Sequence, residues 1–346
     1  MKDKYIAYVG SYTRGSSIGI NMFDVDVENC RFSPRGVAEI SNPSYIKLSH
    51  KKEFLYCSCD EGVGAFKILE DGNLELLNKA SVNGLRPCYL DVDTDNKFLV
   101  TAGYHDGKIS VLRINEDGSV GAVTDEVFMK GLGSVIGKSY ECHVNCALFT
   151  PDERCILAVD QGMDQVKIYD FNKETGKVKL KDILRCELES GPRHMVFTND
   201  GKYAYMTHET TSYVTVYSFD AKKTAFTKLQ TISTLPEGYD SYNKAVTLRL
   251  TGDNKHLLAT NSGNNSVAVY NVDPETRMLT TVCILPVSGD YPRDFLVMPD
   301  GKHVAFANKE EETLTCFTMN YESNYIVMCG PPVKAYEPTS MQMKKL

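Results

Sequence analysis

The sequence has no tryptophan, no long apolar run, no strongly basic stretch and no apolar leader. Tryptophan is missing from 346 residues that include 20 Tyr and 14 Phe, which disfavours repeat families with a signature Trp. No apolar run reaches the length of about 18 residues that a membrane span needs, so we expect no membrane association. The net charge is −7 and no strongly basic run exists, so the sequence lacks the basic patch that is typical of nucleic-acid-binding proteins.

The N-terminus and the cysteines both favour a reducing compartment. The stretch Met1–Ile6 has no apolar core of the kind a signal peptide carries, so we expect no leader. The 11 cysteines are odd in number and spread over the whole chain, which is typical of reduced thiols. Cys57 and Cys59 are two residues apart in a β-type run and so share one face, where they pack as small apolar side chains. A cytoplasmic location follows as an expectation.

One short pattern recurs along the chain and organises it. An aromatic residue or Leu is followed two positions later by an apolar residue, inside a β-type run. The seven copies are Phe23-Asp24-Val25, Phe66-Lys67-Ile68, Leu112-Arg113-Ile114, Tyr169-Asp170-Phe171, Tyr217-Ser218-Phe219, Tyr270-Asn271-Val272 and Phe317-Thr318-Met319. Differences between their first positions run from 43 to 57 residues. Copies are followed by turn clusters such as Glu70-Asp71-Gly72-Asn73, which indicate a hairpin to a further strand.

Two more β-type runs precede the copies that follow the first one, so the repeat has four strands. Examples are His194–Phe197 and Tyr203–Met206, separated by the turn Asn199-Asp200-Gly201-Lys202. Four short strands in about 45 residues, repeated, predict a β-propeller. First strands are expected after residues 43, 87, 143, 193, 245 and 293, and the seventh over Thr339–Met343. We therefore predict an all-β, seven-bladed β-propeller with four antiparallel strands per blade, a single domain over residues 1–346.

The two chain ends are expected to share one blade. The N-terminus supplies runs over Tyr5–Tyr12 and Ile20–Asp26 with no first strand before them, and the C-terminal run Thr339–Met343 supplies the missing strand. Pairing the ends removes an open sheet edge, which would otherwise favour aggregation.

Functional residues are expected on two sets of loops, those before first strands and those between second and third strands. In a propeller these loops emerge on one face, around the central channel. They carry four of the seven His together with several cations, namely His105, His143, His194, His208, Arg86, Arg193, Arg293 and Lys309. Such a cationic mouth on an acidic protein suits an anionic small molecule.

Each of these residues also has a plain structural interpretation. A Pro-Arg pair at a strand start is compatible with an Arg that only covers the blade surface. His143 is as compatible with a structural His as with a functional one, and a loop Glu such as Glu209 is usually a solvated carboxylate. His105, Cys142, His143 and Cys146 suggest zinc, but their spacing fits no closed Cys/His site, so we expect no metal. The sequence also lacks a Gly-x-Ser-x-Gly elbow and a Walker loop.

Several motifs, in order along the whole chain, resemble those of the seven-bladed β-propeller lactonases. They are Gly10-Ser11-Tyr12-Thr13, Asn42-Pro43-Ser44-Tyr45, Gly103-Tyr104-His105-Asp106-Gly107, Gly191-Pro192-Arg193-His194, Thr234-Leu235-Pro236 and Pro292-Arg293-Asp294-Phe295. That family includes propeller-type 6-phosphogluconolactonases and carboxy-cis,cis-muconate cyclases. The resemblance implies hydrolysis of a sugar-acid lactone, with 6-phosphoglucono-1,5-lactone of the pentose phosphate pathway as the leading substrate.

The resemblance also implies roles for individual residues. Carried over, Glu209 or His143 is the general base and Arg193 stabilises the oxyanion or binds a carboxylate. For the phosphate we expect Arg293, Lys309 and His105, since Arg offers a bidentate fork and Lys a point charge. Tyr104, Asn145 and His194 complete the expected substrate-binding set. Two positions depart from the family pattern. Asn145 stands where a second His is common, and Ser262, in Asn261-Ser262-Gly263, stands where an Arg is common.

These departures leave two alternatives open. One is a lactonase or cyclase for another carboxylated lactone, such as a muconolactone. The other is a non-catalytic propeller that binds a ligand or a protein. For the enzyme we expect a small anionic lactone as the partner, no cofactor, no metal, no nucleic acid, and a monomer or weak homodimer.

Overall fold

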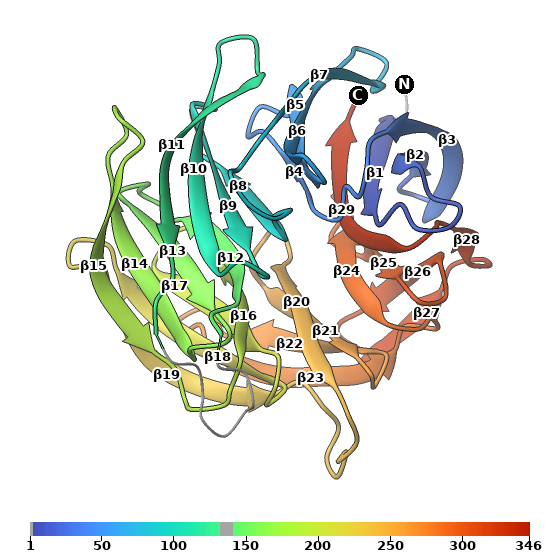
Figure 1. Cartoon of the computed structure of the whole chain (residues 1–346). Helices are drawn as coiled ribbons and strands as arrows, with labels where there is room; N and C mark the ends of the chain where they lie inside the picture. Colours follow the sequence, from blue (N-terminus) through green and yellow to red (C-terminus); the bar gives the residue numbers. More distant parts are fainter. Residues whose placement is uncertain (1–2, 132–140) are drawn as a thin grey trace. The chain divides into compact units, whose positions relative to one another are not determined.

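The chain is built from strands. The computed structural model describes residues 3–131 and 141–346, and within these ranges it contains strands β1 to β29 and no helix. They form seven antiparallel sheets, each with a path of four strands, so the all-β prediction is confirmed (Figure 1). In the part of the chain that is described, no helix offers an apolar stretch long enough to cross a bilayer.

The sheets follow one another along the sequence. The first three complete sheets are β4 (Ile46–Leu48), β5 (Phe54–Cys59), β6 (Gly62–Ile68) and β7 (Leu74–Ala80); β8 (Tyr89–Val92), β9 (Phe98–Gly103), β10 (Lys108–Ile114) and β11 (Val120–Phe128); and β12 (Val144–Phe149), β13 (Cys155–Asp160), β14 (Gln165–Phe171) and β15 (Val178–Arg185).

Three further sheets complete the series. They are β16 (Pro192–Phe197), β17 (Tyr203–His208), β18 (Tyr213–Asp220) and β19 (Ala225–Ser233); β20 (Lys244–Leu250), β21 (His256–Ser262), β22 (Ser266–Val272) and β23 (Leu279–Pro286); and β24 (Pro292–Val297), β25 (His303–Asn308), β26 (Thr313–Asn320) and β27 (Tyr325–Met328), with β28 (Val333–Lys334) paired to β26.

The seventh sheet joins the two ends of the chain. Its order is β29 (Pro338–Lys345), β1 (Tyr5–Ser11), β2 (Gly19–Asp26) and β3 (Arg31–Glu39). Figure 1 shows red β29 beside blue β1. An ion pair of 2.6 Å between Lys345 Nζ and Asp3 Oδ2 adds to this closure. The predicted sharing of one sheet by both termini is confirmed.

The recurring pattern marks the third strand of every sheet. Its seven copies lie in β2, β6, β10, β14, β18, β22 and β26. The turns after three of these strands use Gly72 (φ 86°), Gly118 (φ 86°) and Gly176 (φ 72°), where a side chain would be strained.

The second and third strands form the core of each sheet. Every residue of β9 and of β13 is buried, as expected for strands covered on both faces. The fourth strands are half exposed, because they form the outer edge of each sheet. Burial therefore follows strand position within a sheet.

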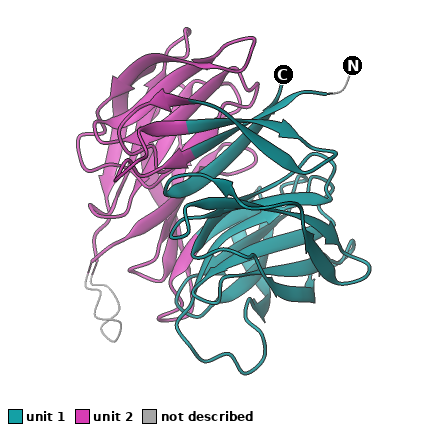
Figure 2. Cartoon of the chain, turned by 90° about the vertical axis from the view of Figure 1, so that its right-hand side faces the viewer, with its two compact units in different colours: residues 1–9, 21–36, 194–345 teal, residues 10–20, 37–193, 346 magenta. Residues whose placement is uncertain are grey.

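The chain folds into two compact units (Figure 2). Unit 1 comprises residues 1–9, 21–36 and 194–345, and unit 2 comprises 10–20, 37–193 and 346. The core of unit 2 includes Tyr56, Leu90 and Leu112. One core cluster of unit 1 includes Leu248 and Tyr270. The expectation of a single domain stays a prediction.

Candidate functional site

In individual sheets, the loop between the second and third strands lies beside the start of the first strand. Gln161 N–H donates to His143 O at 2.8 Å, and Lys309 N–H donates to Tyr291 O at 3.1 Å. The two loop sets that the sequence assigns to function therefore meet at the same end of these two sheets.

His143 in unit 2 is held by Tyr104, in the turn between β9 and β10. The two rings stack with centroids 4.4 Å apart and an interplanar angle of 11°. His143 Nδ1 lies 2.9 Å from Tyr104 O. A carbonyl oxygen only accepts, so Nδ1 is the donor and carries the proton. In the neutral ring Nε2 is then unprotonated and able to accept a proton.

His105 and Asn145 flank this pair. The exposed His105 ring meets Tyr104 edge-on, with centroids 5.2 Å apart. Asn145, the second residue of β12, donates through Nδ2 to Gln161 Oε1. The structure thus brings Tyr104, His105 and His143 together, and it ties Asn145 to a glutamine of the neighbouring loop.

The backbone of His143 is fixed by a buried acid. His143 N–H donates to Asp160 Oδ1 at 3.0 Å, and Asp160 pairs with Lys167 Nζ at 3.4 Å. Asp160 is fully buried, so the strand start cannot shift without breaking a low-dielectric pair. Burial and the nearby Asp160 raise the pKa of the Cys142 thiol, which argues against a thiolate ligand or nucleophile there.

Arg193 is the second residue of β16 and belongs to unit 2. Its loop is shaped by buried Asp164, whose two oxygens accept Glu189 N–H at 2.6 Å and Gly191 N–H at 2.8 Å. Gly191 has φ 64°, a conformation that favours glycine. These contacts fix the backbone from which the half-buried Arg193 side chain extends.

Glu209 in unit 1 is not a solvated carboxylate. It follows β17, is 4% exposed, and forms an ion pair of 2.6 Å from Oε1 to Lys244 Nζ. Lys244 is the first residue of β20, so the pair links two neighbouring sheets. Sequence reasoning missed Lys244, because no Pro-Arg motif marks that strand start.

His194 has the opposite tautomer to His143. Leu248 N–H donates to His194 Nδ1 at 3.3 Å, so Nδ1 accepts and the proton of the neutral ring sits on Nε2. His194 therefore presents a donor, whereas His143 presents an acceptor.

Two hydrogen bonds from the preceding sheet hold the backbone at Pro292 and Arg293. Thr247 Oγ1 donates to Arg293 O at 2.8 Å, and Ser262 Oγ donates to Pro292 O at 2.8 Å. Ser262, which stands where the family commonly has an Arg, is fully buried. Its hydroxyl is used in this structural hydrogen bond. Within the described ranges, the Arg293 guanidinium forms no hydrogen bond or ion pair, which leaves it available for an anion.

Lys309 is partly neutralised. Its Nζ pairs with Glu310 and lies 5.9 Å from the centroid of the Tyr291 ring. A lysine that already has a carboxylate partner attracts a phosphate less strongly than a lone one. Of the two cations expected to hold phosphate in unit 1, Arg293 is the better placed.

Similarity to known proteins extends over nearly the whole chain. Residues 6–343 match the family model for lactonases with a seven-bladed β-propeller. A 6-phosphogluconolactonase of Bacillus subtilis is 30% identical over 345 residues, 98% of each chain. A 6-phosphogluconolactonase of Formosa agariphila is 26% identical, covering 97% of this chain and 98% of its own. The solved structure of the periplasmic gluconolactonase of Pseudomonas aeruginosa superposes with a TM-score of 0.91 at 27% identity, covering 98% of this chain and 99% of that one.

Proposed function

The chain belongs to the seven-bladed β-propeller lactonase family, and on this basis we propose that it hydrolyses the lactone of a sugar acid. The leading substrate is 6-phosphoglucono-1,5-lactone, which would be opened to 6-phosphogluconate. Two relatives that match nearly the whole chain carry the name of that activity.

The observation that supports the reaction best is the tautomer of His143. Lactone hydrolysis needs a base that takes a proton from water as its oxygen attacks the carbonyl carbon. His143 Nε2 is such an acceptor, because Tyr104 O holds the proton on Nδ1. The ring C–O bond then breaks, and the same His returns the proton to the leaving alkoxide. A carboxylic acid and a hydroxyl result, and the acid then releases its proton to solvent as the carboxylate forms, so atoms and charge balance.

The cations stabilise negative charge. We assign Arg193 to the developing oxyanion, where a fixed positive group is worth most. Arg293 is assigned to the phosphate, since a guanidinium offers two parallel donors to its oxygens. His194 Nε2–H and the exposed His105 are further donors for substrate hydroxyls or phosphate.

Glu209 is assigned to positioning Lys244 rather than to proton transfer. A carboxylate 2.6 Å from an ammonium group is stabilised in its charged form and is a weaker base for that reason. Of the two bases that the sequence leaves open, we therefore propose His143.

An unphosphorylated gluconolactone is the second candidate substrate. The pairing of Lys309 with Glu310 lowers the positive charge available for a phosphate. The Pseudomonas aeruginosa neighbour is named as a gluconolactonase.

The test is a side-by-side assay of 6-phosphoglucono-1,5-lactone and glucono-1,5-lactone, followed as acid release at constant pH with the rate in buffer subtracted. We expect a higher kcat/KM for the phosphorylated lactone and a selective loss of that preference in Arg293→Met. Equal loss on both substrates would move Arg293 out of the phosphate site. Folded protein with no rate above buffer on either lactone would reject the proposed activity.

A further inference from the structure

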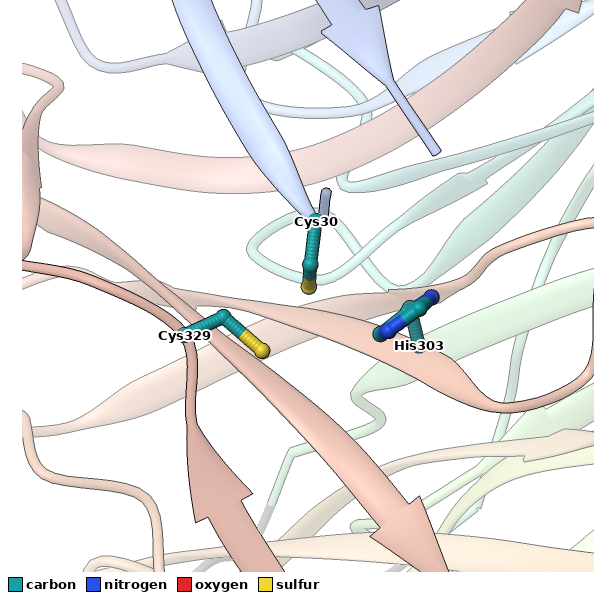
Figure 3. A group of neighbouring side chains, drawn as sticks. All are labelled: Cys30, His303 and Cys329. Carbon is teal, nitrogen blue, oxygen red and sulfur yellow. The ribbon is translucent and has the colours of Figure 1, made fainter. Parts of the chain in front are cut away.

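Three metal-ligating side chains converge in unit 1, outside the residues assigned to lactone chemistry. The Sγ atoms of Cys30 and Cys329 and a ring nitrogen of His303 all lie within 4.8 Å of one another (Figure 3). Cys30 lies in the turn between β2 and β3, His303 begins β25, and Cys329 directly follows β27. Segments far apart in the sequence therefore bring two thiols and an imidazole to one point.

Asp300 orients the imidazole. His303 Nδ1 lies 2.6 Å from Asp300 Oδ2, and His303 N–H donates to Asp300 Oδ1 at 3.0 Å. A carboxylate that holds Nδ1–H leaves Nε2 for a metal, the usual arrangement around zinc-bound histidines.

The thiols sit in a largely apolar shell. Cys30 is 2% exposed and belongs to a core cluster with Phe32, Met298 and Cys316. Thr318 Oγ1 lies 3.1 Å from Cys329 Sγ. The hydrogen bond with Cys316 and burial raise the pKa of the Cys30 thiol, so a metal would have to displace its proton.

A groove borders the residues that support this cluster. A cavity of about 1070 Å³ is lined by Asp300 and Thr318, among other residues of β20–β27 and their turns. Asp300 contacts His303, and Thr318 contacts Cys329. The groove thus reaches the two residues that contact His303 and Cys329, whereas Cys30, His303 and Cys329 are not among the residues that line it.

We propose that Cys30, His303 and Cys329 bind one Zn²⁺ ion, with Asp300 fixing the imidazole. Thiolate and imidazole are ligands that zinc prefers, at bond lengths of about 2.0–2.3 Å, so a small inward movement of the side chains completes the site. Solvent would fill the fourth position. The ion would fasten the β2–β3 turn to the sheet β24–β27. The site goes beyond the proposed lactonase activity and is independent of it, and it departs from the expectation of no metal.

The test uses the full chain, reduced and freed of metal with a chelator, and titrated with Co²⁺ and then Zn²⁺. Co²⁺ bound to two thiolates gives a charge-transfer band in the near ultraviolet, which Zn²⁺ should abolish by displacement. We expect one Co²⁺ per chain, weaker binding as the pH is lowered because protons compete for the thiolates, and a higher thermal midpoint with Zn²⁺.

Variants locate the site. Cys329→Ser should remove the charge-transfer band, and Asp300→Asn should weaken Zn²⁺ binding by about 10- to 100-fold. Cys57→Ser, at a buried cysteine of β5, is the matched control and should bind as the parent does. Cys329 is only half buried, so its variant is the one expected to stay folded, which circular dichroism checks.

Two outcomes would overturn the proposal. One is a reduced parent protein with no thiolate-to-Co²⁺ band at one equivalent of metal. The other is a band that persists unchanged in folded Cys329→Ser, which would place the metal elsewhere. Neither outcome depends on whether the protein hydrolyses lactones.

Discussion

Lys244 Nζ lies 2.6 Å from Glu209 Oε1, at a carboxylate that is almost completely buried. The pair joins the end of β17 to the start of β20. A buried carboxylate that is bonded to a cation stays charged and stays in place. Such a carboxylate is suited to positioning its neighbours rather than to accepting a proton.

Glu209→Gln should therefore lower lactone hydrolysis only moderately. We expect kcat/KM to fall by roughly tenfold, equivalent to about 1.4 kcal/mol of transition-state stabilisation. Lys244→Met should have a similar effect, and the double variant should lose no more than either single change, because the two residues act as a unit. Steady-state kinetics of the three variants check this. A loss of 10³-fold or more in Glu209→Gln alone, of the order expected for removal of a general base, would reassign Glu209 as the base.

The stack of Tyr104 on His143 makes a separate prediction. Tyr104→Phe keeps the ring and the backbone carbonyl that holds Nδ1, so activity should stay near that of the parent. Tyr104→Leu removes the stack, worth about 0.5–1.5 kcal/mol, and kcat should fall several-fold. If the Phe variant is as impaired as the Leu variant, the phenol hydroxyl has a role that the ring geometry does not explain.

A partly buried ion pair between β20 and β24 should matter for stability. Asp294 on β24 pairs with Arg249 on β20 at 2.8 Å and accepts Met341 N–H of β29 at 2.8 Å. Asp294→Asn removes the negative charge beside the guanidinium, and the free energy of unfolding should fall by about 3 kcal/mol. The exposed pair Arg35–Asp24 is the control, and Asp24→Asn should change it by less than about 1 kcal/mol. Urea titrations measure both, and equal effects would contradict the role given to burial.

His256 should make the protein less stable in mild acid. Burial lowers its pKa below the ordinary value of 6.5, against an opposing effect of Asp253. The unfolded chain therefore binds the proton more readily than the folded one. The contribution of neutral His256 to the free energy of unfolding is present above pH 6.5. It is lost as the pH falls from 6.5 toward the lower pKa that His256 has in the folded protein.

His256→Phe keeps the stacked ring against Tyr321, whose centroid lies 3.8 Å away, and removes the titration. Its thermal midpoint should fall less between pH 7 and pH 5 than that of the parent. His50→Gln, at an exposed position, is the control and should follow the parent profile. Identical slopes in the parent and in His256→Phe would show that other groups govern this pH range.

The repeat could be predicted from the sequence because it depends on local spacing. The pattern that begins at Phe23, Phe66 and five further positions marks a third strand each time, since alternation and Gly turns fix a strand within its own segment. The closure by Thr339–Met343 followed from counting strands, because one sheet would otherwise lack its first strand.

The partners of the site residues could not be predicted in the same way. The contact between Glu209 and Lys244 spans 35 positions and depends on how two sheets pack, which no local pattern encodes. The same holds for Cys30, His303 and Cys329, whose ligand atoms meet only after both chain ends have joined one unit. Ser262 was recognised as a departure, but its hydrogen bond to Pro292 O needed the structure.

The most direct measurement is the rate of 6-phosphoglucono-1,5-lactone hydrolysis by the parent protein and by His143→Ala, followed as acid release at constant pH. The parent should exceed the buffer rate, and His143→Ala, still folded by circular dichroism, should lose a factor of about 10²–10⁴ in kcat, because Nε2 is the proton acceptor that we propose. A folded His143→Ala variant that hydrolyses the lactone at the parent rate would contradict this assignment.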